Sequence, residues 1–314
     1  MSMKWLVTGG AGYIGSHVVR ALLNDGLEVV VLDSLISGKL ERLSGSCEVV
    51  IGDVRDEELV SETIRNHRIE GVINLAALKS VEESKEFPQK YQEINHHAMR
   101  KVLDIALQNN VPMFIQSSTA AVYGNSKSGF VTESDKLNPI SPYGFTKAEA
   151  ENELNMEIHK SKLLGCSLRY FNVIGASAAT LKDGSKANIV PMVMDAIERK
   201  QPPKIFGNDY PTKDGTCVRD YVHVEDIARA HVAVVKSFAI SQIPVALNIG
   251  TGIGYSVREV MNEILKQVGS SREPVVVDRR QGDPAMLVAN VDLAEEVLGF
   301  KTQKTLEEMI ASSI

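Results

Sequence analysis

Short apolar runs alternate with amphipathic stretches along the first half of the chain. Runs rich in Val, Ile and Leu are typical of strands that are buried on both faces of a parallel sheet. After a first strand that begins at Lys4, such runs predict strands at residues 28–32, 47–51, 71–77, 113–118 and 166–170. Helical spacing of apolar positions predicts helices at residues 57–67, 88–109 and 142–162. Because strands and helices alternate, we predict an α/β fold with a doubly wound parallel sheet.

The second half of the chain is less regular. The pattern predicts helices at residues 188–199, 223–238 and 256–268 and from 293 to 314, with strands at 245–249 and 273–278. Two polar segments, 176–186 and 201–216, are predicted to be loops, and the second is expected to be a mobile surface loop. We therefore predict a Rossmann domain formed by residues 1–172 and 219–252. A smaller, discontinuous lobe is predicted for residues 173–218 and 253–314.

Composition and charge exclude several classes of function. The chain has 314 residues, 44% of them apolar, and a formal net charge of −6 without any basic run, which argues against a nucleic-acid surface. No apolar run approaches the ~20 residues that span a bilayer, and the N-terminus lacks the regions of a signal peptide. Three separated cysteines without a CxxC pair predict reduced thiols and a cytoplasmic location.

The strand that begins at Lys4 leads into a glycine-rich turn and the start of a helix. Gly9 would permit the tight turn, Gly12 would let a pyrophosphate approach the backbone, and Gly15 would let the helix pack against the strand. The N-terminus of a helix offers unpaired N–H groups to phosphates. The pattern predicts a dinucleotide site, with a glycine-rich turn that binds nothing as the alternative.

Asp33 ends the second predicted strand, eighteen residues after Gly15. This spacing is close to that of a carboxylate that binds a ribose 2′-hydroxyl. Because a carboxylate would repel a 2′-phosphate and no arginine follows directly, NAD is favoured over NADP as the cofactor.

Tyr143 and Lys147 form a Y-x-x-x-K pair at the start of a predicted helix. Four residues make about one helical turn, so both side chains project from one face. An ammonium near a phenol favours the phenolate, so we expect a lowered Tyr143 pKa and a base that works near neutral pH. An ordinary surface pair is the alternative reading of this spacing.

Ser117, Ser118 and Thr119 lie where the preceding strand is predicted to end. Ligands of open α/β sheets bind at the carboxyl ends of the strands. A hydroxyl at this position can bond to a substrate oxygen and relay its proton. A turn or capping hydroxyl is an equally simple explanation for any one of the three.

These features together resemble the extended short-chain dehydrogenase/reductases and, more narrowly, the UDP-galactose 4-epimerase (UDP-glucose 4-epimerase) family. The similarity covers almost the whole chain. Its blocks read GGAGYIGSH, GDVRD, NLAALKSVEES, SSTAAVYG, SPYGFTK, LRYFNVIGA, IFGNDYPTKDGTCVRDYVHVED, LNIGTG and RRQGDPA.

The resemblance implies roles for individual residues. The residues expected to bind NAD are Gly9, Gly12, Tyr13, Ile14, Gly15, Asp33, Asp53, Val54, Leu75, Ala76, Ala77, Lys79, Asn95, Tyr143, Lys147 and Phe171. The residues expected to bind the UDP-sugar are Thr119, Tyr143, Asn172, Asn188, Phe206, Arg219, Arg280 and Asp283. A diphosphate suits the guanidinium groups of the two arginines, although either could instead form a surface salt bridge.

The resemblance also implies the reaction. Tyr143, Lys147 and Thr119 would be catalytic: Tyr143 takes the proton of the sugar's 4-hydroxyl, a hydride passes to NAD, and the 4-keto sugar turns over before the hydride returns. Related dehydratases carry an Asp-Glu pair after the threonine, whereas Ala120 and Ala121 follow Thr119 here. An epimerase acting on UDP-N-acetylhexosamines or another nucleotide sugar, and a non-catalytic NAD-binding protein, are the alternatives.

Three further expectations concern specificity, assembly and metals. In the family, the residue four positions after Asp283 gates the N-acetyl group; here it is Leu287, which predicts a pocket that favours UDP-glucose and UDP-galactose. The family pairs the helices predicted at 88–109 and 142–162 across a homodimer, so a homodimer is expected by resemblance. The histidines lack metal-site spacing, so no metal is expected.

Overall fold

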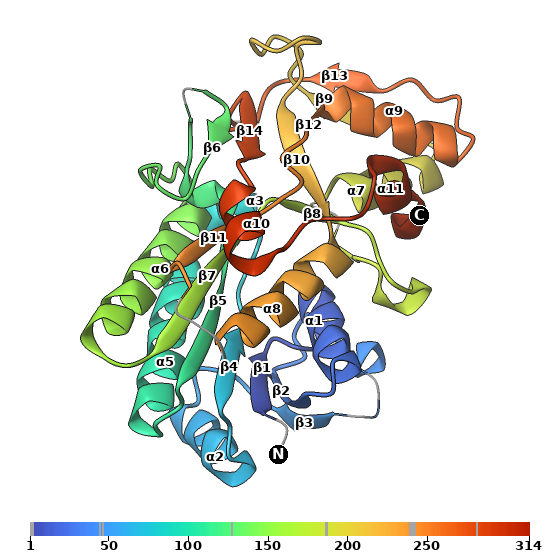
Figure 1. The fold of residues 1–314 in the computed structure, drawn as a ribbon. Helices are drawn as coiled ribbons and strands as arrows, with labels where there is room; N and C mark the ends of the chain where they lie inside the picture. The colour runs from blue at the N-terminus through green and yellow to red at the C-terminus, as the bar shows by residue number, and fades with distance from the viewer. Residues whose placement is uncertain are drawn as a thin grey trace.

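A seven-stranded sheet lies at the centre of the fold (Figure 1). The computed structural model describes residues 3–43, 45, 47–126, 128–185, 188–238, 243–280 and 282–314. The strand order is β11-β7-β5-β4-β1-β2-β3, and all six pairs are parallel. The strands are β1 (Lys4–Thr8), β2 (Glu28–Asp33), β3 (Glu48–Ile51), β4 (Gly71–Asn74), β5 (Met113–Thr119), β7 (Leu164–Tyr170) and β11 (Ala246–Ile249). The predicted doubly wound parallel sheet is confirmed.

Helices cover both faces of this sheet, because alternate strand residues point to opposite sides. Trp5 and Val7 of β1 belong to an apolar cluster with α1 (Tyr13–Asn24) and α8 (Val224–Phe238). Leu6, between them, belongs to the cluster on the other face. That cluster includes α2 (Glu57–His67), α5 (Ala98–Gln108) and α6 (Pro142–Lys160). The order of the strands reverses at β1, where β4 lies on one side and β2 on the other, and ligands of such sheets bind at this switch point.

The helix predicted over residues 88–109 is not a single regular helix. The chain forms α3 (Val81–Glu86), α4 (Pro88–Tyr91), the π-helical turn η2 (Gln92–His97) and then α5. Asn95 lies inside the π-helical turn and its side chain is 1% exposed. Because π turns are rare and frequently occur at functional sites, this deviation makes Asn95 a candidate functional residue.

A second, five-stranded sheet is built mainly from the second half of the chain. It contains β12 (Gly254–Ser256), β10 (Val218–His223), β14 (Met286–Ala289) and β6 (Phe130–Val131) in this order, while β8 (Asn172–Ile174) pairs with β10. A separate two-stranded sheet joins β9 (Lys204–Phe206) to β13 (Val275–Val277). Three helices share one apolar cluster beside these strands: α7 (Ile189–Glu198), α9 (Val257–Gln267) and α11 (Leu306–Ser313).

The structure corrects several boundaries in the second half. The segment 201–216 was expected to be a loop throughout but contains β9, which pairs with β13. The helix expected from 293 to 314 is split into α10 (Asp292–Leu298) and α11, because Gly299 adopts a left-handed conformation and Thr305 caps the next helix. The helix predicted at residues 256–268 is confirmed as α9, and Ser256 caps it in a capping box. The end of the loop predicted at 176–186 (Lys186) lies outside the described residues.

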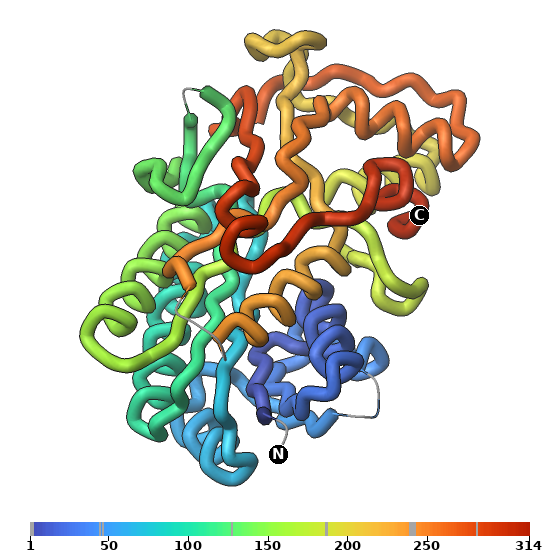
Figure 2. The backbone as a smooth tube through the Cα atoms, in the orientation of Figure 1, coloured from blue at the N-terminus to red at the C-terminus, as the bar shows by residue number. Residues whose placement is uncertain are grey.

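The segment between α10 and α11 crosses the molecule past α8 (Figure 2). Asp226 of α8 accepts hydrogen bonds from the backbone N–H groups of Gln303 and Lys304, at 3.1 and 3.4 Å. Arg229, one turn further along α8, donates to the Lys301 carbonyl at 3.2 Å. These contacts hold the segment against the large sheet's helical layer on its way to α11.

Candidate active site

The glycine turn between β1 and α1 has the geometry that each of its glycines suggested. Gly9 has φ +69°, which favours glycine, and a Cβ there would lie 2.7 Å from the Ala76 nitrogen. A Cβ on Gly15 would lie 2.2 Å from the Gly9 carbonyl oxygen, so the helix could not pack as closely with any other residue. Gly12 precedes α1 and a Cβ there would meet only the Gly9 oxygen, at 3.1 Å. The backbone above Gly12 is therefore open to a ligand.

Asp33 lies beside this turn at the end of β2. Its carboxylate is 7% exposed and accepts hydrogen bonds from the N–H groups of Ala11, at 2.9 Å, and Leu35, at 2.8 Å. One bond to each oxygen leaves lone pairs for a further donor. Asp53 is arranged differently: Arg55 donates to it at 2.6 Å and holds the pKa of its carboxyl below the usual value. Val54, between them, is buried.

The segment after β4 runs along the glycine turn. Leu75 donates its N–H to the Thr8 carbonyl at 3.1 Å, which continues the strand pairing beyond Asn74. The Asn95 side chain holds both polar groups of the Leu78 backbone, accepting from its N–H at 2.7 Å and donating to its carbonyl at 2.9 Å. Asn95 thereby fixes the segment 75–79, which includes Leu75, Ala76, Ala77 and Lys79. The structure thus brings these predicted cofactor residues to the edge of the sheet where Gly9 lies.

Tyr13 and Lys79 face each other beyond this segment. The Lys79 ammonium lies 5.6 Å from the centre of the Tyr13 ring and 3.2 Å from Oδ1 of Asp183. The Tyr13 hydroxyl donates to the Gly175 carbonyl at 2.6 Å. Ile14, the next residue of α1, packs against the apolar cluster that contains Trp5 and Val7 of β1.

Tyr143 and Thr119 come together from two different elements. Thr119 is the last residue of β5, and Tyr143 is in the first turn of α6, which begins after Ser141 caps the Gly144 N–H at 3.1 Å. The Tyr143 and Thr119 side chains are close enough to interact, and this interaction lowers the Tyr143 pKa. The Thr119 hydroxyl also accepts from the Ala121 N–H at 3.2 Å. Burial has the larger effect and raises the Tyr143 pKa, so this pKa lies above the ordinary value.

Lys147 does not act on Tyr143 as the sequence suggested. The expectation of a Tyr143 pKa lowered by the neighbouring ammonium is wrong for this structure. Lys147 instead donates to the Ser117 carbonyl at 2.9 Å and to the Ser117 hydroxyl at 3.0 Å. Burial lowers the pKa of Lys147 to about 8, while the negative charge of Glu151 raises it. The two side chains still share one face of α6, as their spacing predicted.

Several predicted substrate residues form a second group, on the smaller sheets. The Arg280 guanidinium lies 3.9 Å from the centre of the Phe206 ring. Arg219 lies 3.8 Å from the carboxylate of Asp283, so this arginine does have an acidic neighbour, although a distant one. Guanidinium groups stacked or loosely paired in this way keep donors for a phosphate.

The remaining predicted residues lie in the segments after β7 and before α7. Phe171 is buried in an apolar cluster with Ala120 and Leu287. Asn172 follows it and is exposed. Asn188 precedes α7 and donates its side-chain amide to Asp183, so it does not cap the helix with its side chain. Asp183 was not predicted; it contacts both Lys79 and Asn188, and its position in a polar loop gave no signal.

Other residues at the site were also missed. Tyr91 packs edge to face against Tyr143, with ring centres 6.4 Å apart. Ser117 was noted only as one of three hydroxyls, yet it is the partner of Lys147. Glu151 lies one helical turn after Lys147, a spacing that could have identified it.

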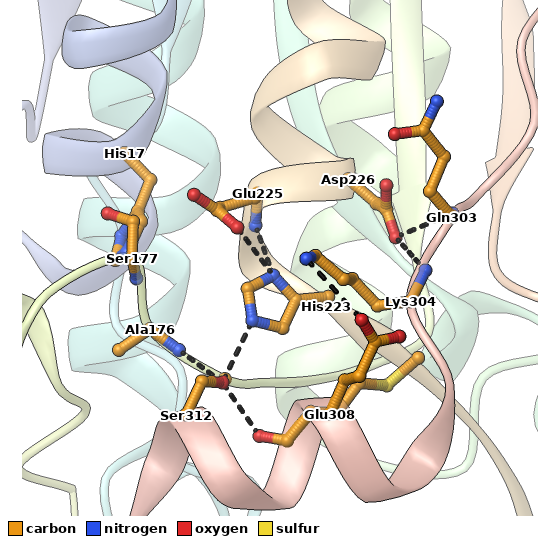
Figure 3. A network of polar contacts seen from close by, with 12 residues as sticks. His17, Ala176, Ser177, His223, Glu225, Asp226, Gln303, Lys304, Glu308 and Ser312 are labelled. Atoms are coloured by element: carbon orange, nitrogen blue, oxygen red, sulfur yellow. Dashed lines mark hydrogen bonds and ion pairs between the residues drawn. The ribbon is translucent and has the colours of Figure 1, made fainter.

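A polar network on the other side of α1 ties the loop after β8 to α11 (Figure 3). His17 accepts from the Ser177 N–H at 3.1 Å, and the Ser312 hydroxyl accepts from the Ala176 N–H at 3.2 Å. His223 accepts from the Glu225 N–H at 3.1 Å through Nδ1, while its Nε2 lies 2.9 Å from the Ser312 hydroxyl. The loop after β8, whose Gly175 carbonyl accepts the Tyr13 hydroxyl, is therefore also bonded to His17 and to Ser312 of α11.

Two cavities lie near this network and away from Tyr143. One of about 660 Å³ is lined by α1, α8 and residues 298–304, and one of about 350 Å³ lies on the other side of the same segment. None of the predicted site residues lines either cavity.

Within the described ranges, no group of three or more His, Cys, Asp and Glu side chains could hold a metal ion. No helix in the part of the chain that is described is long and apolar enough to cross a membrane.

Comparison with known proteins agrees with this geometry. The model of the NAD dependent epimerase/dehydratase family matches residues 5–250. The UDP-glucose 4-epimerase of Lactobacillus helveticus is 39% identical, over 99% of this chain and 96% of the relative. The structure of UDP-glucose 4-epimerase from Brucella ovis in complex with NAD has a TM-score of 0.94 at 36% identity and covers 99% of this chain and 97% of that one. The structure of the Thermotoga maritima enzyme with UDP-glucose has a TM-score of 0.89 at 34% identity, with coverage of 99% and 97%. The chain therefore belongs to the NAD dependent epimerase/dehydratase family and, within it, to the group of the UDP-glucose 4-epimerases.

Proposed function

We propose that this protein interconverts UDP-glucose and UDP-galactose by epimerisation at carbon 4 of the sugar, with NAD as a resident cofactor. The observation that carries the proposal is the contact between the hydroxyls of Tyr143 and Thr119 at the carboxyl edge of the large sheet. This contact lies on a framework that matches relatives named for the same reaction. The enzyme would be an isomerase.

The residues on the amino-terminal side fit a dinucleotide. The open backbone at Gly12 and the start of α1 suit a pyrophosphate, and the free lone pairs of Asp33 suit ribose hydroxyls. We assign cofactor contacts to these residues and to the segment 75–79, Asp53, Val54, Asn95 and Phe171. NAD bound by these residues would supply the hydride acceptor, and then the hydride donor, for carbon 4 of the sugar.

The chain's own groups handle the proton. Tyr143 takes it from the 4-hydroxyl as general base and gives it back as general acid, with Thr119 as hydrogen-bond partner. Burial alone would keep the phenol protonated, so positive charge near it must favour the phenolate. Lys147, whose third ammonium proton is not taken by Ser117, would bind the nicotinamide ribose. The positively charged nicotinamide ring of NAD would supply the charge near the phenol.

The nucleotide is held by residues distant from the reacting carbon. Phe206 offers a ring to the uracil, and Arg219 and Arg280 offer guanidinium donors to the diphosphate, with Asp283, Asn172 and Asn188 as further contacts. Strong anchoring of the UDP and weak anchoring of the sugar would allow the 4-keto sugar to turn over while the nucleotide stays bound. Elimination is disfavoured because Ala120 and Ala121 carry no proton donor or acceptor in their side chains.

We also propose the division into domains, the assembly and the compartment. The membership of the strands in the two larger sheets supports a Rossmann domain of residues 1–172 and 219–252 and a substrate lobe of residues 173–218 and 253–314, with β6 and β10 reaching into the second sheet. Exposed aromatic side chains at Phe87 and Phe145, near the helices expected to pair, support a homodimer. Two buried free thiols, Cys166 and Cys217, support a cytoplasmic location.

A panel of UDP-sugars with product analysis tests the function. The purified protein should carry bound NAD, visible in its absorbance, and convert UDP-galactose to UDP-glucose. If UDP-N-acetylglucosamine were the only UDP-sugar converted, the proposed substrate would change to a UDP-N-acetylhexosamine. Bound NAD without conversion of any UDP-sugar would make the chain a non-catalytic NAD-binding protein.

A further inference from the structure

We propose that Glu151 and Arg169 form a buried positioning pair that keeps Lys147 charged and fixes the end of β5 against α6. Neither residue is expected to touch the substrate or the cofactor. The inference rests on the proposed function, because the role of Lys147 belongs to it.

The pair is fully enclosed and fully bonded. Glu151 is 6% exposed and Arg169 is 5% exposed. Arg169 donates from Nε to Oε1 at 3.0 Å and from Nη2 to Oε2 at 2.7 Å, a bidentate arrangement. Its Nη1 donates to the Tyr123 hydroxyl at 2.8 Å. Because a well-packed apolar pair would often stabilise a core as much, the ion pair calls for another explanation than stability.

Glu151 is tied to the strand that carries Thr119. The Ser118 hydroxyl donates to Oε1 of Glu151, while the neighbouring Ser117 receives the Lys147 ammonium. Two consecutive residues of β5 are thus bonded to two residues of α6 that are one helical turn apart. The next strand residue, Thr119, is the one that meets Tyr143 of the same helix. These bonds therefore hold the strand end that carries Thr119 against the helix that carries Tyr143.

The negative charge of Glu151 also acts on the ammonium group of Lys147. Burial lowers the pKa of Lys147 to about 8, and the Glu151 charge raises it. The titratable groups around them are Tyr143 from α6, Tyr91 from α4, Tyr170 and Cys166 from β7, and Tyr123 and Glu133 beyond Arg169. Burial raises the pKa of Tyr170 and of Cys166, so these two groups are neutral near pH 7. Glu151 is the carboxylate that acts on Lys147.

The test compares Glu151→Gln with the double variant Glu151→Gln/Arg169→Met. The single change removes the charge but keeps the size and an acceptor for Ser118. The double change also removes the cation that would otherwise stay buried without a partner. Glu153→Gln is the matched control, because it removes a carboxylate from the same helix that accepts from Arg100 of α5, at 2.8 Å, instead of from Arg169.

In Glu151→Gln, the alkaline limb of kcat should move down by about one pH unit, because the buried lysine loses its proton more easily. The shift should be smaller in the double variant, because that variant also loses the positive charge of Arg169. Glu151→Asp should keep the wild-type limb but lower kcat, since the shorter side chain keeps the charge and loses the Ser118 bond. An unchanged limb in a Glu151→Gln variant that melts like the wild type and retains NAD would overturn the proposal, as would a double variant that shifts as far as the single one.

A second measurement separates this proposal from the proposed function. The titration of Lys147 can be followed by NMR of 15N-labelled lysine, with Lys147→Met to assign the signal. In Glu151→Gln the midpoint should fall by about one pH unit whether or not any sugar is converted. An unchanged midpoint removes the electrostatic role. Absence of epimerisation in the wild type would remove the proposed function alone.

Discussion

Lys147 donates two hydrogen bonds to Ser117, one to its carbonyl oxygen at 2.9 Å and one to its hydroxyl at 3.0 Å. An ammonium has three protons, so one remains for a ligand. The side chain that would hold the nicotinamide ribose is therefore oriented by the strand end before any ligand arrives. Tyr143, one turn earlier on α6, is coupled to the same strand end through Thr119.

Tyr143→Phe should reduce kcat by about a thousandfold, because the general base is lost while the ring still fills its place. Bound NAD, measured by absorbance after gel filtration, should be unchanged. Tyr91→Phe is the control, since its ring packs on Tyr143 but its hydroxyl donates to Glu83 at 3.0 Å. Full turnover in Tyr143→Phe would remove this residue from the base role.

Gly15→Ala should abolish NAD retention and lower the free energy of unfolding by about 1–3 kcal/mol. The added methyl group would lie 2.2 Å from the Gly9 oxygen, so the turn would have to open. Gly45→Ala is the control, because a Cβ there meets no atom of the described residues within 4 Å. NAD stoichiometry and urea unfolding measure the two effects, and a holo-protein of normal stability would contradict the expectation.

Phe206→Ala and Arg280→Ala should each raise KM for UDP-galactose about tenfold with a small change in kcat, because they would bind the nucleotide and not the reacting carbon. Their stacking at 3.9 Å predicts that the double variant loses less affinity for UDP than the sum of the single losses. Calorimetric titration with UDP measures this coupling. A fall in kcat at unchanged KM would place the pair elsewhere in the mechanism.

Leu287→Ser should raise kcat/KM for UDP-N-acetylglucosamine relative to UDP-galactose. Leu287 is 7% exposed and packs in one cluster with Phe171, so its replacement enlarges the space beside that ring. Competing substrate assays give the ratio directly. An unchanged ratio would mean that Leu287 does not limit the sugar pocket. Val288→Ala, at the next position of β14 and 0% exposed, controls for loss of packing.

The stability of the protein should fall as the pH decreases below about 6.5, the ordinary histidine value. Burial lowers the pKa of His223 to about 4, so the folded protein keeps this residue neutral while the unfolded chain takes up a proton. The stabilisation is present above about pH 6.5 and is lost as the pH falls towards 4, at a cost of about 3 kcal/mol in full. Nδ1 accepts the Glu225 N–H and could not do so when protonated.

His223→Gln should therefore be less stable near neutral pH but show a weaker pH dependence, by about 2 kcal/mol between about pH 7.5 and about pH 5. Urea unfolding at the two pH values measures it. His159→Gln, at an exposed position, should retain the wild-type dependence. The same dependence in His223→Gln as in the wild type would show that another group is responsible.

The large sheet was predictable because its signal is local. Each strand is a short apolar run, and the glycine turn places the first helix, so the parallel sheet followed from alternation alone. Most strands of the smaller sheets were missed, because β6 has two residues and β8 has three, too short for any periodicity. The π turn around Asn95 was missed for a different reason: only its contact with Leu78, 17 positions away, requires it.

At the site, the sequence predicted which residues come together better than it predicted the hydrogen bonds and pKa values of those residues. The shared face of Tyr143 and Lys147 followed from helical spacing. The partner of Lys147 did not, because helical spacing says nothing about which strand end the ammonium meets. The pKa of Tyr143 was misjudged because burial depends on Thr119, Tyr91 and the packing of distant segments, and it exceeds the effect of a nearby charge.

The loop that receives the Tyr13 hydroxyl is held by contacts of unusually large sequence separation. Tyr13 and Gly175 are 162 positions apart, and Gly175 and Ser313 are 138 apart. Contacts of this kind form late, because the loop-closure entropy they require is large. We therefore expect the contacts around the outer side of α1 to form late in folding, so added NAD should slow unfolding while leaving the rate of refolding unchanged.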